Sequence, residues 1–299
     1  MRSKISKSTH RLGIIVLLGA ALLTSASQVF YAHQVQTIHP FLFTGISFFL
    51  TTVFFQLLSF RAPKKVHKGT LIPIIQLNIA SAITFMSFYF ALKYVEPAIV
   101  SSLEIGIAPL FVLAMHVLRK MSIPSRNWLI AAGTLLACII LIFGTSQSSL
   151  FQEGVIHYVI IGLIASCICG IGAVYCADYS KTLSDLGWSS TKILSQRYLL
   201  IIFISFFFTY DLIIPYFKEN ISWIVVMTIF GVLLPNYLLQ KGIQYTNTFL
   251  VMMSLSFIPI FTFIFQRIDT RIDFSPYTAV GVALLFIFGL FSLKKPVEG

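Results

Sequence analysis

Long apolar runs separated by short polar segments make up most of this chain. A run of roughly 20 apolar residues is long enough to cross about 30 Å of hydrocarbon as an α-helix. The first half holds five such runs, at residues 12–32, 38–60, 70–92, 95–118 and 127–144. The second half holds five more, at residues 157–177, 191–210, 221–240, 246–266 and 274–293. The pattern predicts ten transmembrane helices.

The composition agrees with a chain that lies mostly in lipid. Hydrophobic residues make up 57% of the sequence and charged residues 10%, and the mean hydropathy is +0.89. A soluble domain is nearer ~25% charged. Backbone groups in hydrocarbon must be paired within the protein, which leaves helices or a closed barrel, and the short alternating strands of a barrel are absent. We therefore expect an all-α integral membrane protein.

The formal charge of +11 follows the predicted topology. Sixteen Lys and Arg residues fall on one side of the predicted membrane, and four fall on the other, namely Lys93, Lys218, Arg267 and Arg271. Basic residues collect in cytoplasmic loops. This bias predicts that both termini are cytoplasmic, which requires an even number of spans, and that the protein lies in a cell membrane, the inner membrane in a bacterium. It gives no reason to expect a nucleic-acid partner.

The first apolar run has an alternative interpretation as a cleavable signal peptide. A basic stretch precedes it, and Ser25-Ala26-Ser27 resembles a cleavage site. Cleavage would leave nine spans and place the termini on opposite sides, which conflicts with the basic pair Lys294 and Lys295.

The two halves resemble each other at an offset of about half the chain. Three features recur: Lys93-Tyr94 as Gln244-Tyr245, Pro109-Leu110-Phe111 as Pro259-Ile260-Phe261, and Pro124 as Pro276. Since each half has an odd number of predicted spans, consecutive copies would enter the membrane in opposite directions. We therefore predict two inverted five-helix repeats, residues 1–149 and 150–299, an arrangement typical of secondary transporters with a site at the repeat interface.

The sequence resembles the drug/metabolite transporter superfamily, and in particular its EamA-type members with ten helices. The resemblance is carried by Ala91-Leu92-Lys93-Tyr94, then Ala98, Ser102 and Leu103, and finally Pro109-Leu110-Phe111. It implies helices around a central cavity and the export of amino acids or other metabolites. The family often has an Arg on the second helix of each repeat; Arg197 stands there in the second half, and Ser47 in the first.

Glu104 is the first candidate for a functional side chain, because it lies about mid-span, five residues before Pro109. A charged side chain at the bilayer centre costs at least ~2.5–3.5 kcal/mol, so it normally faces a wet cavity or a partner. Glu104 could carry a coupled proton, bind an ammonium group of the substrate, or form a structural ion pair. Arg197 is its obvious partner, but its place near the end of the predicted seventh span favours snorkelling or a structural role.

Polar residues at helical spacing indicate which faces are wet. The further candidates for substrate binding or coupling are Thr24, Gln28, Asn78, Ser81, Tyr89, Ser101, Asn236, Gln240 and Ser256. The alternative is that these side chains form hydrogen bonds from one packed helix to another. Pro109 and Pro259 are candidate hinges, because proline in a span frees backbone groups and kinks the helix.

The remaining chemistry excludes more than it suggests. The four cysteines, Cys138, Cys167, Cys169 and Cys176, fit small buried residues better than a metal or disulfide framework. No metal or other cofactor is expected. No HExxH, GxSxG, P-loop or intramembrane acidic pair indicates an enzyme.

These patterns predict a secondary transporter that exports an amino-acid-like or cationic metabolite by alternating access, with or without proton coupling. Its expected partners are a small-molecule substrate and the lipid bilayer, and a monomer is expected. The alternatives are an uptake carrier for a solute such as S-adenosylmethionine, a passive channel, a scaffold and a membrane-embedded enzyme.

Overall fold

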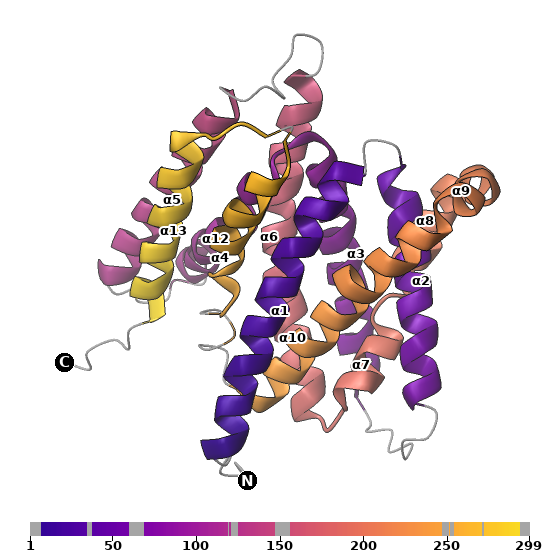
Figure 1. Cartoon of the computed structure of the whole chain (residues 1–299). Helices are drawn as coiled ribbons and strands as arrows, with labels where there is room; N and C mark the ends of the chain where they lie inside the picture. The colour runs from indigo at the N-terminus through magenta and orange to yellow at the C-terminus, as the bar shows by residue number, and fades with distance from the viewer. Residues whose placement is uncertain are drawn as a thin grey trace.

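The computed structural model describes residues 7–34, 38–59, 69–118, 120, 125–146, 156–246, 251, 254–270 and 272–293. All regular structure in these ranges is helical, which confirms the all-α prediction (Figure 1). The first half forms α1 (Lys7–Gln34), α2 (Pro40–Ser59), α3 (Leu71–Tyr94), α4 (Pro97–Leu118) and α5 (Ser125–Ser146). The second half forms α6 (Ile156–Asp185), α7 (Ser190–Gln196), α8 (Leu199–Thr209), η1 (Tyr210–Leu212), α9 (Ile213–Met227), η2 (Thr228–Leu233), α10 (Leu234–Tyr245), α12 (Ile258–Phe265), η3 (Gln266–Ile268) and α13 (Pro276–Leu293).

Several of these helices have the length and hydropathy of membrane spans. Seven described helical segments qualify, and Pro97–Phe111, Ile258–Ile268 and Pro276–Phe291 are shorter apolar helices. Many large apolar side chains point outward, including Ile214 at 81% exposure and Leu57 at 70%. Such a surface suits lipid and not water. The chain is therefore a multi-pass integral membrane protein.

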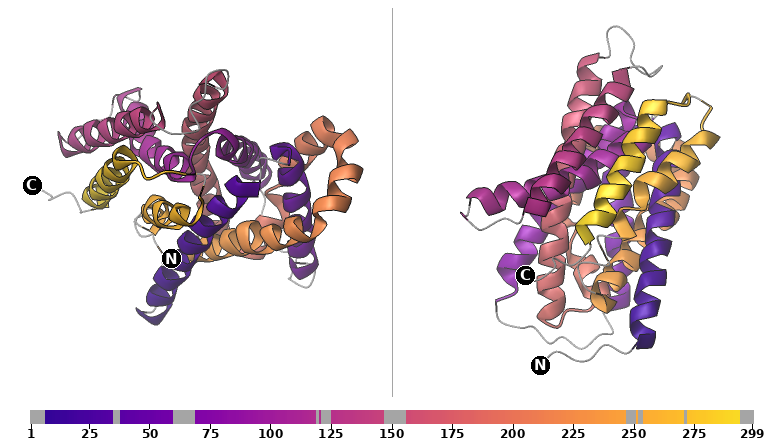
Figure 2. Two further views of the ribbon diagram at one scale, coloured as in Figure 1. Left: turned by 45° about the horizontal axis from the view of Figure 1, so that its top comes forward. Right: turned by 90° about the vertical axis from the view of Figure 1, so that its left-hand side faces the viewer.

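The helices pack in pairs drawn from the two halves of the chain. The helix α3 lies along α6, α1 along α10, α2 against α7 and α8, and α5 against α13. Figure 2 shows α5 and α13 on one flank of the molecule and α2 with α8 on the other. The helices α1, α3 and α6 lie between these flanks and surround the centre.

Glycines on α6 allow its neighbours to come close. A Cβ at Gly170 would overlap Ile107 and the carbonyl oxygen of Glu104 on α4, and a Cβ at Gly172 would overlap Thr84 on α3. Small residues let helix backbones approach in membranes. The α6 glycines therefore form a close-packing surface.

The predicted seventh span is interrupted, because α7 ends at Gln196 and α8 begins at Leu199. Asn78 of α3 bonds to both sides of the break: its Nδ2 donates to the Gln196 carbonyl at 2.7 Å, and its Oδ1 accepts from the Leu200 N–H at 3.2 Å. Backbone groups in a membrane interior need such partners wherever a helix stops. The predicted span at residues 191–210 lies in one apolar helical segment of membrane length, Ser190–Pro215, and the break within it places Arg197 between two helix ends.

The predicted eighth span also departs from regular helix, since the π-helical stretch η2 joins α9 to α10. Pro235 follows after one intervening residue, in the first turn of α10. Proline has no N–H to donate to the carbonyl four residues earlier, here that of Gly231, and it disturbs the preceding turn. This accounts for the widened stretch.

Candidate functional site

A cavity of about 130 Å³ lies at the centre of the helices. Its wall includes side chains of α1, α3, α4, α6, α9 and α10, so both halves of the chain contribute. A single water needs roughly 10–15 Å³ by this measure. The cavity therefore has room for several waters or for part of an organic solute.

Glu104 forms part of this wall and is only partly buried, although it lies within α4. The thiol of Cys169 on α6 donates a hydrogen bond to its carboxyl group. Tyr89 of α3 lies near enough to interact with it electrostatically. The close approach of α6 at Gly170 fixes the α4 backbone at this point.

Arg197 also lines the cavity, where it is 5% exposed. Its Nε donates to the Ser81 hydroxyl at 2.8 Å, and its guanidinium group donates to the Cys176 sulfur. The same group lies over the rings of Phe85 and Tyr198, at 5.4 and 5.5 Å from their centroids. The structure thus places Arg197 against the cavity and does not show it reaching the membrane surface.

Two ion pairs in the described part of the chain are His33 with Asp269 and Lys181 with Asp185. Neither Glu104 nor Arg197 takes part in one. The structural pairing of these two residues, one of the three roles considered for Glu104, is therefore not present.

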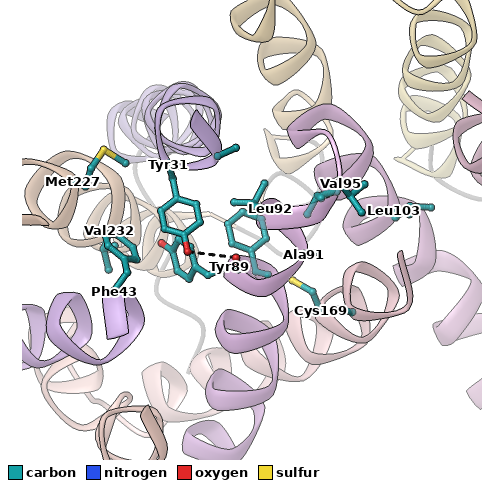
Figure 3. Close-up of a cluster of buried hydrophobic side chains, with 14 of the residues drawn as sticks. Tyr31, Phe43, Tyr89, Ala91, Leu92, Val95, Leu103, Cys169, Met227 and Val232 are labelled. Carbon is teal, nitrogen blue, oxygen red and sulfur yellow. Dashed lines mark hydrogen bonds between the residues drawn. The ribbon is translucent and has the colours of Figure 1, made fainter. Parts of the chain in front are cut away.

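An aromatic cluster borders the cavity near the end of α1. Tyr31 packs on Phe43 and Tyr89, each at 4.7 Å between ring centroids, and Trp223 lies 5.3 Å from Phe43. Figure 3 shows the Tyr31 hydroxyl pointing to the backbone carbonyl of Tyr89, at 3.4 Å. Beyond this cluster, Nδ1 of His33 lies 3.4 Å from Asp269. In the opposite direction the wall continues to Ser180 of α6 and to residues of α10.

The structure gathers about half of the predicted site residues around the cavity. Those that line it are Thr24, Gln28, Tyr89, Glu104, Arg197 and Asn236. Gln28 is 2% exposed, its Oε1 accepts from Thr262, and its Nε2 has no hydrogen-bond partner among the described residues. A buried donor of this kind needs a water or a polar solute group.

The other predicted residues are buried and do not line the cavity. Asn78 bonds to the backbone at the break before α8, and Ser81 accepts a hydrogen bond from the Arg197 side chain. The Ser101 hydroxyl donates to the carbonyl of Pro97 in its own helix, at 2.9 Å. Gln240 and Ser256 are also buried and do not line the cavity. Of the two candidate hinges, Pro109 lies inside α4 and Pro259 in the first turn of α12.

Sequence reasoning missed the two thiols that contact the charged groups. Cys169 and Cys176 were interpreted as packing residues, and they do pack, but they also line the cavity. Their separation of seven residues places them on one face of α6, two turns apart. Among the described residues, no cluster of three His, Cys, Asp or Glu side chains could hold a metal ion.

Comparisons with known proteins agree with this architecture. Residues 11–144 match the EamA-like transporter family. No curated protein matches the chain. One protein of known crystal structure is similar over 95% of this chain and 98% of its own, with a TM-score of 0.64 and 16% identity. At that identity the likeness shows a shared fold.

Proposed function

We propose that the chain exports a small charged metabolite by alternating access, because residues 11–144 match the EamA-like transporter family and several helices have the length and hydropathy of membrane spans. The observation that carries this proposal is the central cavity, which joins both halves of the chain and has Glu104 and Arg197 in its wall. A charged group in a membrane interior is costly and generally serves a substrate, an ion or a proton.

The packing of the helices supports two inverted repeats, residues 1–149 and 150–299. If α1 to α5 correspond to α6, α7/α8, α9/α10, α12 and α13, then the pair α3 with α6 corresponds to α10 with α1, and α4 with α6 corresponds to α12 with α1. The pairs α2 with α7/α8, α5 with α13 and α4 with α12 correspond to themselves. This is the pattern expected of two copies related by a twofold axis in the membrane plane.

Individual contacts support the same correspondence. A Cβ at Gly162, at the start of α6, would lie 2.8 Å from Val95, just after α3, and a Cβ at Gly13, near the start of α1, would overlap Thr246, just after α10. Val95 and Thr246 both have extended backbone, and the N–H of each donates to the carbonyl four residues earlier at 2.9 Å.

The direction of the helices supports ten crossings with both termini on the cytoplasmic side. In Figure 1, α1 begins at the lower end of the molecule and α13 runs downward to its last residue. The shorter α4, α12 and α13 pack against one another, and α4 and α13 also pack against the longer α5. The first and last described helices thus begin and end on the same side of the bundle, as an even number of crossings requires.

The proposal gives Glu104 a role that can be tested. The carboxylate either takes up a proton while the solute leaves or pairs with a cationic group of the solute. Purified protein in liposomes should move at least one solute of a metabolite panel, with and without a pH gradient. The Glu104→Gln variant should transport that solute more than 10-fold more slowly and without response to the gradient. Asp178→Asn, a change at an exposed acid on α6, is the matched control.

Two results would count against this function. If Glu104→Gln moves every active solute as the wild type does at all pH values, both roles of the carboxylate are wrong. If no solute of the panel crosses the bilayer with either protein, transport itself loses its support.

A further inference from the structure

The two charged groups of the cavity are held apart by α6. The Glu104 carboxyl group is hydrogen-bonded to the Cys169 thiol, and the Arg197 guanidinium group is hydrogen-bonded to the Cys176 sulfur. Seven residues of α-helix span about 10 Å at 1.5 Å per residue. The carboxylate and the guanidinium group therefore mark two ends of the candidate site, about two turns of α6 apart, and neither takes part in a described ion pair.

Each of these groups has neutral partners that orient it. On the Arg197 side these are the Ser81 hydroxyl, the Cys176 sulfur and the faces of Phe85 and Tyr198. On the Glu104 side the partner is the Cys169 thiol. Neutral hydrogen bonds fix the direction of a charge without cancelling it, and a buried charge without a counter-ion is costly. Both groups are thus prepared for opposite charges that come from outside the protein.

The wall between the two ends is mostly apolar. Ala173 lies on α6 between the two cysteines, and Phe85, Phe88 and Thr84 of α3 also line the cavity. A solute that met both charges would pass a largely hydrocarbon and aromatic surface in its middle part. This favours a chain or ring between its two charged groups.

From this geometry we propose that the cavity binds an elongated zwitterion, with its ammonium group on Glu104 and its carboxylate on Arg197. The inference rests on the proposed transport function, because it takes this cavity as the solute site. An α-amino acid carries both charges on one carbon and can satisfy only one end. The preferred solute instead has its charges separated by a spacer, as in an ω-amino acid.

A series of ω-aminoalkanoic acids measures the separation directly on the wild-type protein. An extended chain advances ~3.5 Å for every three bonds, and each charged contact takes up roughly 2.8 Å. Stabilisation of the full-length protein in detergent, measured as the rise in Tm at a fixed ligand concentration, should peak for chains of about four to eight carbons. Glycine, longer homologues, and the n-alkylamine and n-alkanoate of the best length should each stabilise less.

Variants assign each end of the ligand. Glu104→Gln should weaken the best zwitterion about 10- to 100-fold and leave the n-alkanoate unchanged, since one contact to a charged group is lost. Arg197→Gln should weaken binding of the best zwitterion to a similar extent and leave binding of the n-alkylamine unchanged. Asp178→Asn and Lys181→Gln, at charges on α6 outside the cavity wall, are the matched controls.

The outcomes separate this inference from the proposed function. If the n-alkylamine stabilises the wild type as well as every zwitterion does, or if the gain shows no optimum in chain length, the zwitterion site is wrong, while Glu104-dependent transport of a cation would leave the function intact. If no solute binds and none is transported, both are wrong. The ω-aminoalkanoic acid series on the wild-type protein tests the zwitterion site even if Arg197→Gln does not fold.

Discussion

Replacing Asn78 by Leu tests the helix break that positions Arg197. The change keeps a side chain of similar size and removes the bonds to the Gln196 carbonyl and the Leu200 N–H. Each buried backbone group left without a partner costs about 1–3 kcal/mol. Two such groups predict a loss of about 2–6 kcal/mol in the free energy of unfolding. The same change should weaken solute binding, because the break that carries Arg197 is no longer fixed.

The measurement is reversible unfolding of the purified protein in mixed micelles, with Tm as a second readout. Asn127→Leu, at an exposed position on α5, is the matched control and should stay within about 0.5 kcal/mol of the wild type. If Asn78→Leu is as stable as this control, the break does not depend on Asn78. An unstable variant that still binds solute with wild-type affinity would show that Arg197 is held by other contacts.

Three further predictions concern packing around the cavity. Gly170→Ala should destabilise the protein by about 1–3 kcal/mol and reduce transport, because the new methyl group overlaps α4 beside Glu104. Gly19→Ala, where the nearest atom to the new methyl group is 3.7 Å away, should leave both stability and transport unchanged. Gly13→Ala and Gly162→Ala should each lower Tm, and the two decreases in Tm should add in the double variant, as expected for equivalent contacts that lie far apart. One neutral and one damaging change would weaken the case for the repeat. Tyr31→Ala should cost about 3–5 kcal/mol and let solute leak without a coupling gradient, while Tyr31→Phe, which loses one long hydrogen bond, should cost less than about 1.5 kcal/mol; a tight bilayer with the Ala variant would mean that the aromatic cluster is not a barrier.

The sequence predicts the features of this fold that depend on local pattern. Within the described residues, the apolar runs of membrane length coincide with helices or with consecutive helices. Glu104 could be recognised because an acid within an apolar run is costly wherever the helix faces. These signals need no knowledge of distant contacts.

The role of Arg197 could not be found in this way. In a continuous helix it lies near the end of a span, where a long basic side chain reaches the interface. The break at this residue depends on Asn78, 118 residues away in the sequence, and no local signal marks that contact. The cysteines were missed for a related reason, since their identity is compatible with packing and only the fold shows that they face the cavity.

The α6 helix contributes both close helix contacts and cavity-lining side chains. At 100° per residue, Cys169, Ala173 and Cys176 form a single stripe along this helix, with Gly170 to one side and Gly172 to the other. Gly170 meets α4 and Gly172 meets α3, so the two close contacts flank the stripe that faces the cavity. The helix runs unbroken for 30 residues, whereas the interruptions at α7/α8 and at η2 lie in other helices around the cavity. If the cavity opens and closes at those interruptions, the spacing of the charge partners along α6 stays constant through the cycle, and solutes are selected by length in every state.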